Sequence, residues 1–328
     1  MAITVAGLYQ TMVEVADQSA AARKPAIKNA LIQVLVKLTG DSNIKSNENI
    51  SALINSAERY VQQFRYQQAK LEDEQLEPAT ELWVQFDETA VNQALREYSL
   101  PVWGKERPSV LVWLAQEKNN IRNLISLDDE LGYLKSIAES AETRGISLLF
   151  PLFDLEDTSA MSVSDLWAGF SEPVLNASAR YQADIVLTGR LTQALPTLWE
   201  INWTTYTDDE VSIWSNQAEL AEMVLEEGIN ELADRLAARY VNTGSTLAES
   251  IELTVSAINS VDDYAKTLSY LESLQAVVSV KVKRVIENEV MFELNSQGGF
   301  PVLEQALKLG KQLEQVNTNE KIVYRLLP

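Results

Sequence analysis

The sequence contains neither cysteine nor histidine among its 328 residues. Without a thiolate or an imidazole there is no Ser-His-Asp or Cys-His nucleophile pair, no histidine base near neutral pH, and no thiolate or imidazole ligand for zinc or haem. The lack of cysteine also excludes disulfides, but it leaves the compartment open. Carboxylate, lysine, tyrosine and backbone chemistry remain.

Long apolar runs are also missing. Nowhere do about 18 uncharged apolar residues follow one another, and residues 1–5 do not place a basic segment before an apolar stretch. The sequence therefore predicts no stable insertion in a membrane, and it shows no secretion signal of its own.

Basic side chains are few relative to acidic ones. Lys and Arg number 27 against 47 Asp and Glu, which gives a formal net charge of -20. Binding to nucleic acid or anionic lipid needs Lys and Arg gathered on one face, so neither is expected as a partner. The closest basic cluster, Lys281, Lys283 and Arg284, alternates with valines. That alternation is typical of the solvated face of a strand.

The length and a hydrophobic content of 46% predict two or three domains, each with its own core. Within residues 1–100, apolar alternation over 3–15 predicts a half-buried strand, and apolar spacing by threes and fours over 22–38 predicts an amphipathic helix that ends at Gly40. Pro25 predicts that the regular helix starts close to it or bends there. The other elements expected here are helices at 48–59 and 88–98 and strands at 60–69 and 81–86.

Two prolines and a glycine in residues 100–108 predict a domain boundary, and a second linker is expected at 242–245. Between them, 108–242 is predicted to be an α/β domain that opens with a strand buried on both faces at 109–114. The other elements expected in it are helices at 127–144, 173–181 and 219–240, strands at 146–153, 183–191, 198–206 and 211–219, and a polar loop before the helix at 173–181.

The last domain, 247–328, shows the order strand, helix, strand, strand, helix, strand. That order is the ferredoxin-like βαββαβ pattern. The fold class predicted for the whole chain is therefore α/β and α+β in three small domains.

Part of the first domain resembles a known family. The resemblance is carried by VADQS at residues 15–19, by Arg23, Ala26 and Ala30, and by VLVKLTG at residues 34–40. These residues are similar to a proteobacterial family described only as domain of unknown function 2066 (DUF 2066). Members usually begin with a secretion signal, so the resemblance implies a periplasmic protein whose signal is absent from this sequence.

The middle domain looks like an α/β domain of the bacterial envelope. A predicted helix runs into the trio Ala183, Asp184 and Ile185, and the strand that follows ends near Gly189. This element is similar to one in the TolB amino-terminal region, the flagellar H-ring protein and the curli and lipoprotein activators. Those proteins dock to other envelope proteins rather than catalyse a reaction. The resemblance is at the level of fold, so it implies docking only as an expectation.

Paired acidic residues occur at 128–130, 208–210, 226–227 and 262–263. Each is interpreted as a helix cap, a turn or a solvated face, because neighbours in sequence do not face each other across a pocket. The alternating oxygen ligands with glycine that calcium prefers are missing. The sequence therefore predicts no catalytic residues, no metal site and no cofactor.

Tryptophans are the remaining candidates for a binding surface. Trp103 and Trp167, in a predicted linker and loop, are candidates for an interface, and Trp113 is a further candidate. Three more lie on the predicted meander and are expected in the core: Trp199, Trp203 and Trp214.

These observations predict a non-enzymatic periplasmic protein that binds other envelope proteins, periplasmic or inner-membrane, as an adaptor or scaffold. Two alternatives remain open. One is a carboxylate-dependent glycan hydrolase whose acids converge from separate domains. The other is a small-ligand sensor with a pocket between the first two domains, lined by Trp103 or Trp113.

Overall fold

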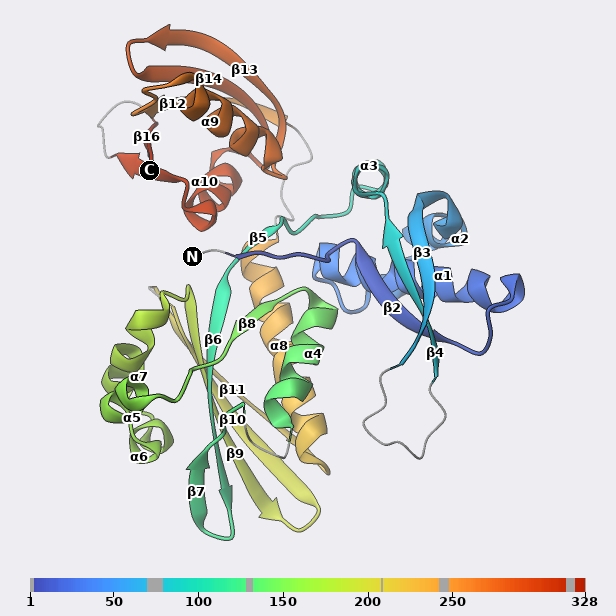
Figure 1. Ribbon diagram of the computed structural model, residues 1–328, viewed down its shortest axis with the longest axis vertical. Coiled ribbons are helices and arrows are strands. Elements are labelled where there is room, and N and C mark those ends of the chain that lie inside the picture. The colour runs from blue at the N-terminus through green and yellow to red at the C-terminus, as the bar shows by residue number, and fades with distance from the viewer. Residues whose placement is uncertain are drawn as a thin grey trace. The chain divides into compact units, whose positions relative to one another are not determined.

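The computed structural model describes residues 3–69, 79–127, 132–207, 209–241, 248–316 and 322–327 (Figure 1). Helices and strands alternate along the chain, so the mixed α/β and α+β class is confirmed. Contacts between Cα atoms divide the chain into two compact units, residues 1–5 with 106–235 and residues 6–105 with 236–328. Among the helices of the described ranges, none combines the length and the apolar character needed to cross a bilayer.

The described α-helices are α1 (Ala20–Thr39), α2 (Ser51–Asn55), α3 (Glu88–Glu97), α4 (Tyr133–Arg144), α5 (Leu155–Ala160), α6 (Val163–Ala168), α7 (Ser171–Ser178), α8 (Ala221–Tyr240), α9 (Val261–Ser273) and α10 (Gly299–Gly310). Single 3-10 turns are η1 (Ile44–Ser46), η2 (Glu48–Ile50), η3 (Ala57–Tyr60) and η4 (Ala179–Tyr181). The strands are β1 (Ile3–Thr4), β2 (Gln10–Val15), β3 (Val61–Gln68), β4 (Thr80–Phe86), β5 (Glu106–Arg107), β6 (Ser109–Lys118), β7 (Ile121–Leu124), β8 (Ser147–Leu149), β9 (Ile185–Leu195), β10 (Leu198–Tyr206), β11 (Val211–Ala218), β12 (Ala248–Ser256), β13 (Val277–Ile286), β14 (Glu289–Gln297), β15 (Leu313–Val316) and β16 (Val323–Leu326).

In the first stretch of the chain, which is the predicted domain of residues 1–100, α1 packs against the antiparallel sheet β2-β4-β3. The helix begins before Pro25 rather than at it, because the hydroxyl of Ser19 accepts the backbone N–H of Ala22 at 3.2 Å and caps the first turn. Gly40, with φ of 72°, ends the helix as predicted. Pro25 therefore lies inside the helix, where it removes one backbone hydrogen bond.

Two other predicted elements of this stretch are divided. The strand expected over 3–15 is interrupted at Gly7, whose φ of 78° favours glycine, so β1 and β2 are separate. The helix expected over 48–59 is replaced by η2, α2 and η3. The hydroxyl of Ser56 bonds to the carbonyls of Ala52 and Leu53, which competes with continuation of the helix.

The middle stretch, which is the predicted domain of residues 108–242, forms a sheet with the strand order β11-β10-β9-β6-β7. Strand β8 also pairs with β6. Strand β6 runs parallel to β8 and β9. In Figure 1, α4 and α8 lie on one side of this sheet and α5, α6 and α7 on the other. Residues 109–115 are all buried, so the prediction of a strand covered on both faces is confirmed.

One face of this sheet is organised around Trp203 of β10, whose side chain is fully buried. A Cβ at Gly228 of α8 would lie 2.0 Å from its Nε1, and a Cβ at Gly189 of β9 would lie 2.5 Å from its Cζ3. The indole therefore occupies space that only two glycines leave free. It stacks on Trp214 of β11 at 6.3 Å between ring centroids. Trp199, Trp203 and Trp214 are all buried, so their prediction as core residues is confirmed.

The last stretch, which is the predicted domain of residues 247–328, forms the sheet β13-β14-β12-β16-β15, with α9 and α10 packed on one face. It follows the predicted order up to α10 and then differs. The hairpin of β15 and β16 reverses the chain, so β16 pairs with β12 in parallel. In a ferredoxin-like sheet the last strand lies antiparallel to the first. Strand β15 was not predicted, because four residues are too few to show a period.

Candidate functional site

The best candidate for a functional surface is the layer of α5, α6 and α7 over the six-stranded sheet. Most of this segment was expected to be a polar loop. The carboxylate of Asp154 accepts the backbone N–H groups of Glu156 and Asp157 at 3.1 Å and starts α5. Ser162 and Asp165 form a capping box that starts α6. Helices this short are marginal alone, so the layer depends on these caps and on packing.

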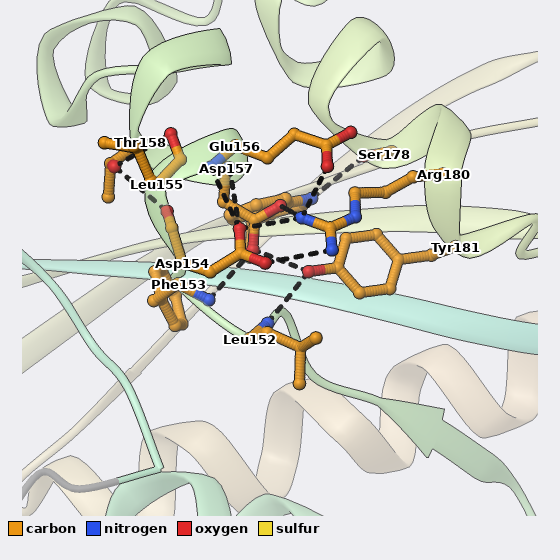
Figure 2. A network of polar contacts seen from close by, with 11 residues as sticks. Leu152, Phe153, Asp154, Leu155, Glu156, Asp157, Thr158, Ser178, Arg180 and Tyr181 are labelled. Carbon is orange, nitrogen blue, oxygen red and sulfur yellow. Dashed lines mark hydrogen bonds and ion pairs between the residues drawn. The ribbon is translucent and has the colours of Figure 1, made fainter.

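The buried carboxylate of Asp157 connects α5 to η4 through hydrogen bonds (Figure 2). Asp157 is 1% exposed, and its Oδ2 accepts hydrogen bonds from the hydroxyl of Tyr181 at 2.6 Å and the backbone N–H of Phe153 at 2.8 Å. The guanidinium of Arg180 donates to Asp157 at 3.3 Å and to both carboxylate oxygens of Asp154 at 2.7 and 2.9 Å. The start of α5 is thereby fixed to η4, which follows α7.

These contacts shift the pKa values of Asp154 and Tyr181 away from neutral pH. Hydrogen bonds from Arg180 lower the pKa of Asp154 to about 2. Burial, together with the hydrogen bond to Asp157, raises the pKa of Tyr181 to about 12. At neutral pH Asp154 is therefore charged and Tyr181 neutral, and neither is poised to exchange a proton with a substrate. The network has the properties of a structural tie.

Two of the acidic pairs highlighted by the sequence lie on helices. Residues 226–227 are exposed on α8, and Asp262 and Asp263 lie in the first turn of α9. Residues 128–130 and 208, like the linker expected at 242–245, lie outside the described residues. Within the described ranges no group of three or more acidic side chains is placed to hold a metal ion. Four further carboxyl groups have a lowered pKa because neighbouring side chains donate hydrogen bonds to them: Asp17, Asp165, Asp263 and Glu293.

Two of the three predicted interface tryptophans are buried. Trp103 is 2% exposed, and its backbone N–H donates to the carbonyl of Leu38 at 2.6 Å, at the end of α1. Trp113 is 0% exposed, and its Nε1 donates to the hydroxyl of Ser178 at 2.9 Å. The ring of Phe153 packs edge-on at 5.5 Å from it. Both indoles are therefore core residues of their own stretches, and neither presents a surface to a partner.

Trp167, the third predicted interface residue, is partly exposed on α6. The guanidinium carbon of Arg122, from β7, lies 4.6 Å from its ring centroid. Its carbonyl accepts a hydrogen bond from Arg190 at 2.9 Å. Phe170, at the start of α7, is 58% exposed. Neither Arg122 nor Phe170 is indicated by the sequence, because the four residues of β7 are too few to show a period and the helix expected at 173–181 begins after Phe170.

A second tryptophan and arginine pair was also missed. Trp83 is partly exposed on β4, and the guanidinium carbon of Arg65, from β3, lies 4.5 Å from its ring centroid. The two residues are directly opposite each other in the ladder. Alternation along β4 could have indicated this position, because Trp83 falls between the buried Leu82 and Val84.

Comparison with known proteins gives a match for the first stretch. Residues 2–104 match the model of a family described as domain of unknown function (DUF8605). Among solved structures, the C-terminal domain of LpoB from Salmonella enterica is similar over 34% of this chain and 82% of that chain, at 14% identity and a TM-score of 0.25. No curated protein matches the chain in sequence. The first stretch is thus similar to an uncharacterised family, and a structural similarity this low carries no argument about function.

Proposed function

We propose that the chain is a non-enzymatic periplasmic protein that binds other envelope proteins as an adaptor or scaffold. The proposal divides it into three domains, residues 1–100, 108–242 and 247–328. This division is supported by the sheets, because each sheet of three or more strands is built within one of these ranges. Binding would use rigid surfaces and no cofactor.

We also propose that the chain is related to the DUF 2066 family and that its middle domain is related to the TolB amino-terminal region. Asp184, in a segment that carries this likeness, accepts hydrogen bonds from the backbone N–H and the hydroxyl of Ser109 at 2.9 and 2.8 Å. These contacts join the starts of the parallel strands β6 and β9. The residue is therefore best explained as part of the fold, which supports a shared architecture rather than a shared reaction.

The observation that carries the docking role is the surface of Trp167, Arg122 and Phe170. Tryptophan and arginine dominate the energetics of protein interfaces, and aromatic residues are enriched there. Trp167 lies on α6, Arg122 lies on β7, and Phe170 immediately precedes α7. They lie in and beside a layer that the network of Asp157, Arg180 and Tyr181 holds in place. A rigid aromatic surface loses little conformational entropy when it binds.

The test is a site-specific photocrosslink in the native bacterium, with a benzophenone amino acid in place of Phe170. The captured envelope protein is identified, purified and titrated against the full chain. Trp167→Ala and Phe170→Ser are each expected to weaken this binding by at least about tenfold. The matched control is Trp83→Ala, which removes a tryptophan of similar exposure that also stacks with an arginine.

The control separates the proposed surface from a general effect of losing an aromatic residue. Phe170→Ser also guards against misfolding, because a side chain 58% exposed contributes little to a core. Unchanged affinity for both variants of the middle domain would refute the surface. Equal losses for Trp167→Ala and Trp83→Ala would show that the effect is not specific to it.

A further inference from the structure

A second interaction surface lies at the edge of the last sheet. Strand β13 has ten residues and pairs with β14 on one side. It is the first strand of the sheet order, and the described part of the chain places no strand on its other side. A long free edge offers backbone N–H and C=O groups to another chain.

The edge carries apolar side chains that the fold leaves uncovered. Four of them are large and exposed: Val278 at 59%, Val282 at 40%, Val285 at 61% and Ile286 at 46%. Edges that only prevent association use charged residues and bulges. Strand β13 has two irregularities in its register and three basic residues, but these devices do not account for four exposed apolar side chains.

The register places the central valines and two basic residues of β13 on opposite faces. Val282 lies opposite Phe292 of β14, which is fully buried on the face covered by the helices. Lys281 lies opposite Glu293, on the other face of the sheet. Residues directly opposite each other share a face, so Val282 and Val285 lie on the helix side of the free edge, and Lys281 and Arg284 lie on the open side. Ile286, opposite Glu289, also lies on the open side.

The three basic groups on this edge differ in how closely they are paired. Lys283 already pairs with Glu252 at 2.6 Å and with Glu293 at 3.0 Å, and these hydrogen bonds raise its pKa. Lys281 and Arg284 are exposed and make no ion pair of their own within the described ranges, although the charge of Lys281 contributes to the lowered pKa of Glu293. In a chain with a net charge of -20, they form a local site for negative charge.

We propose that β13 binds an extended peptide segment in which acidic residues alternate with apolar ones. Such a segment would add a strand to the sheet, with its acidic side chains beside Lys281 and Arg284 and its apolar side chains beside Val282 and Val285. A second copy of β13 is a poorer occupant, because antiparallel pairing would bring like charges together. This inference names the chemistry of one partner for the proposed docking role and rests on that role, but its surface is distinct from that of Trp167.

The test uses the full chain and fluorescein-labelled peptides of about ten residues, the length of β13. One peptide alternates Glu with Val and Thr, a second has the same composition with its acids in one block, and a third has Lys in place of Glu. Fluorescence anisotropy is expected to give at least about tenfold tighter binding for the alternating peptide. Hydrogen exchange is expected to slow in β13 when this peptide is bound.

The variant Lys281→Glu with Arg284→Glu is expected to weaken binding of the alternating peptide by at least about tenfold. The matched control is Lys266→Glu with Lys308→Glu, which changes net charge equally on exposed positions of α9 and α10. Equal affinity for the three peptides, or equal losses in both double variants, would overturn the inference. Concentration-dependent dimers that vanish only in the β13 variant would also overturn it, by assigning the edge to a second copy. Because Trp167→Ala leaves β13 intact, failure of either test is distinguishable from failure of the other.

Discussion

Replacing Gly228 with alanine is expected to destabilise the middle sheet, although alanine is the better helix former. The added Cβ would lie 2.0 Å from Nε1 and 2.6 Å from Cε2 of Trp203. The indole cannot retreat, because its other edge lies against Gly189, where the corresponding distance is 2.5 Å. Overpacking costs about 1–3 kcal/mol, and this fully buried site belongs at the upper end. Alanine returns about 1 kcal/mol of helix propensity, which leaves a net loss of about 2 kcal/mol.

The loss is measured as the free energy of opening from hydrogen exchange of peptides in α8 and β10, which isolates this sheet from the rest of the chain. Glu227→Ala, on the exposed side of α8, is the control and is expected to stay within about 0.5 kcal/mol of the wild type. Trp203→Phe removes Nε1, so the double variant with Gly228→Ala should lose less than the sum of the two single losses. A Gly228→Ala protein as stable as the wild type would refute the packing argument.

Two predictions concern the network of Figure 2 and its dependence on pH. The pKa of Asp154 is about 2 in the folded chain and about 4 in an unfolded one. Its stabilising contribution is therefore complete above about pH 4 and is lost as the pH falls toward 2. Asp154→Asn should flatten the acid limb of a stability profile measured by thermal melts. The pKa of Tyr181 is about 12 folded against about 10 unfolded, so its contribution is complete below about pH 10 and is lost as the pH rises through 12. Tyr181→Phe should flatten the alkaline limb, and an unchanged limb in either variant would show that the group does not titrate with folding.

Long periodic elements could be predicted from the sequence. The helix expected at 219–240 is found as α8 (Ala221–Tyr240), because its apolar residues recur over five turns on one face. The buried strand expected at 183–191 is found as β9 (Ile185–Leu195). Strand parity likewise placed Trp199 and Trp203 on one buried face.

Short elements and burial within connecting segments could not be predicted. Trp103 lies between Pro101 and Pro108, a composition that indicates a linker, but its indole is buried at the end of α1. Its environment is set by residues more than 60 positions earlier in the sequence, which no local pattern records. Strand β15 is defined by its pairing with β16 rather than by its own four residues. Tertiary contacts decided each of these cases.

The candidate docking surface lies in a segment whose first two helices show no apolar period in the sequence, and one cause explains both its exposed apolar residues and its missing period. Helices α5, α6 and α7 pack on the sheet through a small set of buried apolar residues, but their starts are set by caps and by the contacts of Asp157 and Arg180. Polar residues of this kind are typical of loops. Because caps and polar contacts supplement this small core, the layer does not need every apolar side chain for packing. Leu155 therefore remains 82% exposed and Phe170 58% exposed, whereas most large apolar side chains of α8 are buried. The polar caps and contacts explain why these helices lack an apolar period in the sequence. They also explain why apolar surface remains for a partner.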